Sequence, residues 1–453
     1  MNLLLKNRFN QFPFSPSRSP VFYGWFIILW GTLGVIMSVP GQTVGVSTFT
    51  DHLIAALKIS RNELSLAYLL GTLSSSLILT RAGEIYDKIG ARWLGVIITI
   101  ALGAVLILLS QIDHIAFGIG HFFQSGNSQF YISFVTIMIG FFLLRFCGQG
   151  VLTMLSRNMM MKWFEKKRGL ANGISNVFVA LGFAIAPLVF EYLIENNGWR
   201  SAWIMMACIA GFGFCIIVFI FFRDNPEDCG LLPDGEQPGK PGNSSFQSQT
   251  ARKQYTLREA KKTFCFWVFI VGLSMQALFI TGYTFNIVSI FAAANMDKTT
   301  ALGIFVPTSV ISVGLSLIGG WLSDHIKLKY LLSFFLVGQG LAMVSMCILG
   351  PGIPYLMLIV GNGIVGGLYS VLAAVVWPQF FGRQHLGAIS GFAMSAMVLS
   401  SALGPLLFSL SYTRLGSYGW GAAICLVIVI INLVFSFKAD NPQEKRREVI
   451  NRS

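Results

Sequence analysis

The sequence is poor in charge, and above all in acids. Charged residues make up only 11% of 453 residues, with 19 Asp and Glu against 32 Lys and Arg. Soluble domains carry about 25% charged residues, so a soluble chain of this length could not cover its exterior. This excludes a cytosolic enzyme, a disordered regulator and a nucleic-acid-binding protein, the last despite a net charge of +13. The 54% hydrophobic content indicates a polytopic membrane protein.

Patterns that would support catalysis or metal binding are also lacking. The seven cysteines have no metal or redox spacing and nearly all lie in apolar runs, so we expect small hydrophobic side chains rather than disulfides. The five histidines are scattered, and no Gly-x-x-x-x-Gly-Lys-Ser/Thr loop for nucleotide phosphates is found. We therefore expect no metal, no cofactor and no direct ATP drive, and no enzyme activity.

Long apolar runs dominate the rest of the chain. A membrane-spanning helix needs about 20 mostly apolar residues, and we expect an all-α fold with twelve such helices. The predicted spans are Phe22–Gly45, Leu64–Gly83, Trp93–Ile112, Ile132–Met154, Leu170–Leu193, Ala202–Phe222, Phe264–Ile290, Leu302–Ser323, Leu331–Gly350, Tyr355–Trp377, Gly387–Leu410 and Trp420–Phe437.

Lys and Arg predict the orientation and the domains. If both termini are cytoplasmic, most of the 32 basic residues fall in cytoplasmic loops, as the positive-inside rule requires. We expect a bacterial-type inner (plasma) membrane. The predicted parts are a cytoplasmic N-tail (1–21), a six-helix bundle (22–222), a cytoplasmic linker (223–262), a second six-helix bundle (263–437) and a cytoplasmic C-tail (438–453).

The two predicted bundles repeat the same motifs in the same order. Such a repeat indicates a duplicated six-helix unit, and transporters built this way bind substrate near the midplane where the repeats meet. The pairs are Gly83-x-x-x-Asp87 with Gly320-x-x-x-Asp324, Gly169-x-x-x-Gly173 with Gly387-x-x-x-Gly391, Pro187 with Pro405, and Gly198-Trp199 with Gly419-Trp420.

Several of these segments resemble the major facilitator superfamily. Gly83–Arg92 resembles its second-to-third loop signature, Arg145–Gly150 its fourth-helix motif Arg-x-x-Gly-x-Gly, and Gly182–Pro187 its fifth-helix motif. Trp163–Gly173 and Tyr23-Gly24-Trp25 are similar to monocarboxylate-porter and oxalate/formate-antiporter-like members. The resemblance implies two pseudo-symmetric six-helix bundles that transport a substrate by alternating access.

The loop after the second span combines glycines with charges and is a candidate gate. The glycines permit a tight turn, and Asp87 can meet basic groups or a helix N-terminus. Alternatively, its basic residues only fix the topology. We expect a weaker copy after the eighth span. The gating motif comprises Gly83, Asp87, Lys88, Gly90, Arg92, Gly320 and Asp324, with helix bends at Pro187 and Pro405.

Arg145 lies near the middle of the fourth span, where an arginine costs about 2.5–3.5 kcal/mol. It must therefore find a partner, and two roles stay open: binding an anionic substrate, or structural pairing that helps proton coupling. Arg157, near the cytoplasmic end, could snorkel to lipid headgroups or bind a carboxylate. With no carboxylate at the centre of any span, the cavity should favour anions.

Neutral polar residues complete the candidate substrate or coupling site. They are Gln42 in the first span, Tyr283 and Asn286 in the seventh, and Asn362 and Tyr369 in the tenth. Hydrogen bonding between helices is the alternative role for each.

These observations favour a secondary-active transporter of a small organic anion or carboxylate, by proton symport or exchange. Its expected partners are the anionic substrate, protons and membrane lipids, and a monomer is expected. The alternatives are an exporter of drugs, siderophores or metabolites, a polytopic membrane enzyme, and a transport-like sensor.

Overall fold

The computed structural model describes residues 12–122, 129–235 and 253–444. The remaining residues of the predicted tails and linker, 1–11, 236–252 and 445–453, lie outside the described residues. Within the described ranges every regular element is a helix, which confirms the predicted all-α class. The contacts divide the chain into two units. Unit 1 comprises Met1–Trp163, Phe178–Lys240 and Ser390–Ser395, and unit 2 comprises Phe164–Val177, Pro241–Ile389 and Ala396–Ser453.

Ten helical stretches in the described parts of the chain are long and apolar enough to cross a membrane. Two of them, Arg61–Ser110 and Arg168–Phe221, have 50 and 54 residues. At about 1.5 Å per residue each is long enough to cross a bilayer twice. Each also contains one glycine with a positive φ, Gly90 at 82° and Gly198 at 76°, where the helix changes direction. The ten stretches thus accommodate the twelve predicted spans.

The first predicted span is not one helix. The chain forms α2 (Gly24–Met37), a short 3-10 turn η2 (Val39–Gly41) and then α3 (Thr43–Ser47). Pro40 lacks the N–H that would continue α2, and Gln42 is extended at φ −85° and ψ 158°. The predicted span Phe22–Gly45 thus corresponds to the apolar stretch Gly24–Ser47, whose helix is interrupted at Val39–Gln42.

The remainder of unit 1 is built around one long bent helix. Ser60 caps α5 (Arg61–Ser110) by accepting the N–H of Glu63, whose carboxylate accepts the N–H of Ser60 in return. The fourth span is longer than the predicted Ile132–Met154 and contains a π-helical segment, η3. The other elements are η1 (Pro16–Arg18), α4 (Thr50–Leu57), α6 (Ile112–Phe122), α7 (Gln129–Arg145), η3 (Phe146–Leu152), α8 (Thr153–Trp163), η4 (Ala207–Gly213, also π-helical), α10 (Phe214–Phe221), η5 (Glu227–Cys229) and η6 (Pro233–Gly235).

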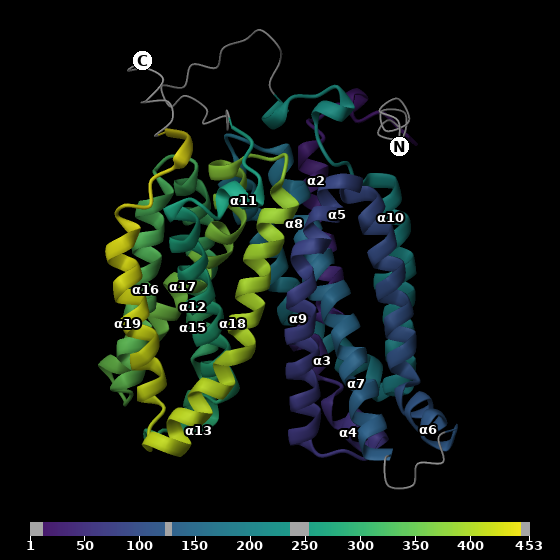
Figure 1. Ribbon diagram of the computed structural model, residues 1–453, viewed down its shortest axis with the longest axis vertical. Helices are drawn as coiled ribbons and strands as arrows, with labels where there is room; N and C mark the ends of the chain where they lie inside the picture. The colour runs from purple at the N-terminus through teal and green to yellow at the C-terminus, as the bar shows by residue number, and fades with distance from the viewer. Residues whose placement is uncertain (1–11, 123–128, 236–252, 445–453) are drawn as a thin grey trace. The chain divides into compact units, whose positions relative to one another are not determined.

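Helix α9 (Arg168–Met206) belongs to both units, because its residues up to Val177 make their contacts in unit 2 and the rest in unit 1. Pro187 lies within α9 and Pro405 within α18 (Leu386–Leu415), and both helices continue through the proline. Both helices are labelled in Figure 1.

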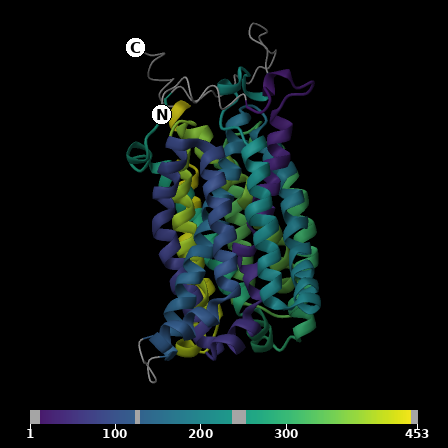
Figure 2. The same ribbon diagram turned by 90° about the vertical axis from the view of Figure 1, so that its right-hand side faces the viewer.

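Unit 2 repeats the pattern of a broken first helix. Helix α12 (Phe264–Phe285) ends at Asn286, and α13 (Ile287–Ala293) follows directly. Its core near the start of α12 is aromatic, with Phe266 packed edge-on against Trp377 and Phe381. Figure 2 shows the ribbon of Figure 1 turned by 90° about the vertical axis. The other elements are α11 (Leu257–Ala260), α14 (Lys298–Gly303), α15 (Phe305–Ser323), α16 (Leu328–Cys347), α17 (Ile353–Phe381) and α19 (Gly419–Ser436).

Candidate functional site

The break in the first span of unit 1 is held by Arg145, the last residue of α7. Its Nη1 donates to the carbonyl O of Gly41 at 3.2 Å and to Oγ1 of Thr43 at 3.3 Å. The guanidinium carbon lies 5.1 Å from the centre of the Tyr68 ring. The Tyr68 hydroxyl donates to the same Thr43 Oγ1 at 2.9 Å. The four residues form one cluster, here named the Arg145 cluster, in which Thr43 is exposed and Arg145 is 3% exposed.

The charge of Arg145 is not neutralised inside unit 1. Its Nε has no hydrogen-bond partner, and no carboxylate of residues 12–122, 129–235 or 253–444 forms an ion pair with it. Its hydrogen-bond acceptors are neutral oxygens. A buried charge of this kind is costly unless a counter-ion meets it, so the cluster has the electrostatics of an anion site.

Buried charge in the described residues is mostly basic. Among the described residues Asp113 is the one acid of the fully buried class, whereas Asp224 and Asp324 are half-buried. Arg200 binds Asp113 with both terminal nitrogens, at 2.6 and 2.5 Å. Hydrogen bonding by Arg200 holds the pKa of Asp113 below its usual range. The buried basic residues are Arg92, Arg145, Lys162, Arg168 and Arg223.

Gln42 lies next to the Arg145 cluster and makes hydrogen bonds across the helix break. Its Nε2 donates to Oγ of Ser38 at 3.0 Å and to Oγ1 of Thr153 at 3.2 Å. It thereby ties the two sides of the helix break to α8. Arg157 is half-buried on α8, twelve residues beyond Arg145. A rise of 1.5 Å per residue separates the two by about 18 Å along the helix axis, so Arg157 does not join the cluster.

The predicted residues of unit 2 lie on two helices. Tyr283 and Asn286 are at the end of α12, where the hydroxyl of Tyr283 is buried without a hydrogen-bond partner. Nδ2 of Asn286 donates to the carbonyl O of Gly282 at 2.9 Å, and Ser409 of α18 donates to its Oδ1 at 3.5 Å. Asn286 therefore caps the helix break, and Tyr283 keeps an unused polar group one turn away.

Asn362 and Tyr369 lie seven residues apart on α17 and hence on one face of it. Asn362 is 5% exposed, and its side-chain Oδ1 has no hydrogen-bond partner. The hydroxyl of Tyr369 contacts Sδ of Met397 at 3.1 Å, and its ring stacks on Phe335.

Asp324, at the end of α15, binds the start of α9 within unit 2. Its two carboxylate oxygens accept the N–H of Gly169 at 2.8 Å and of Leu170 at 3.0 Å. Burial raises the pKa of Asp324 to about 6, although the two N–H groups act in the opposite direction. A Cβ on Gly320 would overlap the carbonyl O of Gly169, so this close approach requires glycine at both positions.

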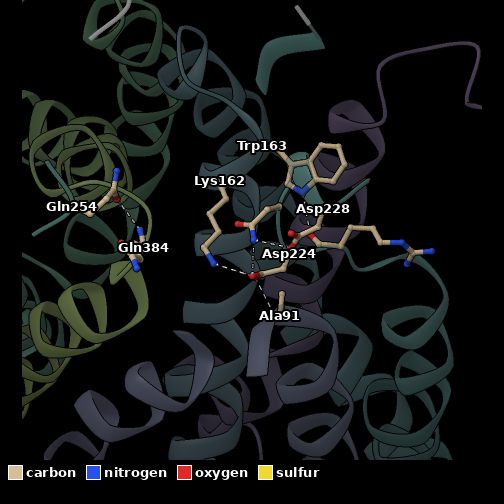
Figure 3. Close-up of polar contacts among 9 residues, drawn as sticks. Ala91, Lys162, Trp163, Asp224, Asp228, Gln254 and Gln384 are labelled. Atoms are coloured by element: carbon tan, nitrogen blue, oxygen red, sulfur yellow. Dashed lines mark hydrogen bonds and ion pairs between the residues drawn. The ribbon is translucent and has the colours of Figure 1, made fainter. Parts of the chain in front are cut away.

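The matching loop in unit 1 is held by a residue that we did not predict. Asp224, just after α10, accepts the N–H of Ala91 at 3.2 Å and the ammonium of Lys162 at 3.1 Å (Figure 3). Gly90 supplies the positive φ beside it, and Arg92 donates its Nε to the carbonyl O of Phe222 at 3.0 Å. An acid directly after a basic residue at a span end, Arg223-Asp224, was the available signal.

The other members of the predicted gating motif differ in their burial. Lys88 is exposed and Asp87 is half-buried, whereas Gly83 is buried in α5. In unit 1 the Cα of Gly83 is one of the atoms that a Cβ on Gly391 would meet, at 3.4 Å. The segment Ser390–Ser395 of α18 packs here, and Ser390 accepts Nδ2 of Asn158 at 2.7 Å.

Comparison with known proteins gives one family and several relatives. The model of the Major Facilitator Superfamily matches residues 26–362. Human "Monocarboxylate transporter 10" is 25% identical over 309 residues, covering 64% of this chain and 56% of that protein. "Probable sulfoacetate transporter SauU" of Cupriavidus necator is 23% identical over 314 residues, covering 62% of this chain and 69% of that protein. The chain thus spans little more than half of the human relative.

Solved structures agree with this chain in fold. The proton:xylose symporter XylE, bound to 6-bromo-6-deoxy-D-glucose, has a TM-score of 0.67 at 15% identity and covers 93% of this chain and 98% of its own. The Escherichia coli fucose:proton symporter FucP has a TM-score of 0.59 at 13% identity, with 92% and 99% covered.

Proposed function

The chain belongs to the major facilitator superfamily and is a membrane transporter, and from this premise we propose that it carries a small organic anion bearing a carboxylate or sulfonate group. The transport cycle is secondary-active and works by alternating access. In this proposal, Arg145 binds the anionic group of the substrate, and Thr43 and Tyr68 orient the guanidinium.

The unneutralised charge of the Arg145 cluster carries this proposal. A guanidinium offers a planar fork of donors that suits two oxygens of a carboxylate or sulfonate. The Nε of Arg145 is unused, and exposed Thr43 stands beside it. An incoming anion would satisfy this donor and remove the cost of a buried unpaired charge. The relatives described as monocarboxylate and sulfoacetate transporters support an anion of this size.

We propose anion exchange as the first form of coupling to test, with proton symport as the alternative. Proton symport needs a group that gains and loses a proton during the cycle. In the described residues the one acid of the fully buried class is Asp113, which Arg200 keeps ionised at the end of a span. The half-buried acid whose pKa burial raises, Asp324, lies at the end of α15, where its carboxylate accepts two backbone N–H groups of α9. Exchange of one anion for another needs only the arginine.

Uptake into proteoliposomes tests the proposal. Radiolabelled pyruvate, lactate and sulfoacetate are offered to vesicles that hold the same unlabelled anion, or to empty vesicles with an inward proton gradient. We expect Arg145→Gln to reduce uptake of the best substrate by at least 100-fold, because one lost charged contact is worth about 3 kcal/mol. Arg145→Lys should retain part of the activity, with a raised KM.

Arg81→Gln is the matched control, since Arg81 is an exposed arginine of α5 outside the cluster. It should transport at the rate of the unaltered protein. Transport of neutral or cationic compounds, with none of the anions carried, would refute the substrate class. Full anion uptake by a folded Arg145→Gln variant would refute the role of Arg145.

For the membrane arrangement we propose that both termini face the cytoplasm of a bacterial-type inner membrane, on the distribution of Lys and Arg. We propose that the contacts of Asp324 and Gly320 with the start of α9 are part of the gate. They are hydrogen bonds and close backbone contacts, which are lost as soon as the two helix ends move apart. We propose a monomer as the transporting species.

A further inference from the structure

An apolar groove runs between α12 and α19 in unit 2, near the end at which α12 begins and α19 finishes. Its volume is about 310 Å³. Trp267 and Ile431 on its walls are 45% and 51% exposed. The lining residues are Phe264, Trp267, Val268, Val271, Ile428, Ile431, Asn432 and Phe435.

The polar groups that line the groove already have hydrogen-bond partners within the protein. The amide of Asn432, its one polar lining group besides the Trp267 indole, donates to the carbonyl O of Val268 at 3.1 Å. The indole Nε1 of Trp267 donates to the carbonyl O of Lys261 at 2.8 Å. Both donors are therefore satisfied within unit 2, and the open walls offer only hydrocarbon contacts to an occupant.

Basic residues lie next to the groove in sequence at the end where α12 begins and α19 finishes. Phe264 and Phe435 meet edge-on there, with ring centroids 5.6 Å apart. Lys262 lies two residues before Phe264, and Lys438 lies three residues after Phe435. Both lysines are exposed, so each wall of the groove has an exposed lysine within three residues of its last lining residue at this end.

These two lysines are not neutralised by the acids of the same region. Glu259 pairs with Lys253 at 2.8 Å, and Asp440 and Glu444 pair with other lysines, at 2.6 and 3.1 Å. Within residues 12–122, 129–235 and 253–444, neither Lys262 nor Lys438 forms an ion pair. Lysines needed only for topology would not have to flank a groove.

We propose that this groove binds one acyl chain of an anionic phospholipid, whose phosphodiester headgroup is held by Lys262 and Lys438. An apolar channel with cations at one end matches an acyl chain attached to a negative headgroup. A second copy of this chain fits less well, because a symmetric contact would bring the same lysines together. A zwitterionic lipid would leave the lysines without a net counter-charge.

Fluorescence quenching by brominated lipid tests this site. The full-length protein is placed in nanodiscs that contain acyl-brominated phosphatidylglycerol or acyl-brominated phosphatidylcholine at equal mole fraction. Subtracting the signal of Trp267→Phe isolates the emission of Trp267. We expect brominated phosphatidylglycerol to quench this emission several-fold more efficiently than brominated phosphatidylcholine.

Paired substitutions show whether the lysines cause the preference. Lys262→Ser with Lys438→Ser should reduce the quenching ratio of the two lipids to about one. Arg414→Ser removes an exposed cation at the end of α18 and should leave the ratio unchanged. Equal quenching by both lipids, or a preference that persists without the two lysines, would overturn the proposal. So would a stable dimer that excludes lipid from Trp267.

Discussion

At the scale of single residues, Asp224 connects parts of unit 1 that are far apart in sequence. Its carboxylate accepts from the backbone N–H of Ala91 and from the ammonium of Lys162, whose side chain is 5% exposed. The Lys162 ammonium also lies 4.5 Å from the centre of the Tyr86 ring. Removing one member of a buried ion pair is more damaging than removing both, because the survivor stays charged without a partner.

We therefore expect Asp224→Ala to lower the free energy of unfolding by about 3 kcal/mol or more. The double variant Asp224→Ala with Lys162→Met should recover part of this loss. Denaturant unfolding of the purified protein measures both. Asp51→Ala is the matched control, because Asp51 forms an exposed ion pair with Arg61 that should contribute less than about 1 kcal/mol. Equal losses from Asp51→Ala and Asp224→Ala would contradict the argument.

Single residues could be predicted from the sequence only where their position was itself unusual. An arginine near the centre of an apolar span is recognised from the sequence because such a position is unusual for a charge. In the structure Arg145 is buried and donates to neutral oxygens. Its partner Tyr68 is an ordinary polar aromatic residue, so nothing marked it. Asp224 meets residues 62 and 133 positions away, and one sequence contains no record of such pairing.

At the scale of elements, hydropathy located the spans but not their interruptions. A window of about 20 residues averages over the three residues of η2 and over a single break at Asn286. Pro40 followed by Gly41 was a local signal that the predicted helix must end. The π-helical segment Phe146–Leu152 has no such signal, although its Gly148 allows the close approach to Gly41.

Two glycines of α15 provide a matched test of close helix packing. Gly320 faces the backbone of α9 at Gly169, whereas a Cβ on Gly314 would meet nothing within 4 Å. We expect Gly320→Ala to destabilise the protein by about 1–3 kcal/mol through overpacking. Gly314→Ala should be neutral or stabilising by up to about 1 kcal/mol, because alanine favours helix. Thermal unfolding in detergent compares them, and equal effects would show that the α9–α15 contact contributes little.

At the scale of the whole molecule, the internal repeat predicts two six-helix bundles, and that division stays a prediction. The predicted division into 22–222 and 263–437 follows the order of the chain. The two contact-defined units are a separate division, in which Phe164–Val177 belongs to unit 2 and Ser390–Ser395 to unit 1. A linear sequence shows where a linker lies, whereas the side on which a helix end packs depends on tertiary contacts such as Asp324 with Gly169.

Because part of α9 belongs to unit 2 and part of α18 belongs to unit 1, cutting the chain between the two units should affect the folding of both pieces. Fragments 1–240 and 241–453, expressed as separate chains, would each lack a segment that completes its own unit. Each fragment alone should be proteolysed or aggregate, whereas the co-expressed pair should copurify and regain uptake. A lone fragment as resistant to protease as the pair would show that the donated segments are dispensable. If the lone fragments are degraded and the pair is stable, each fragment folds only in the presence of the other.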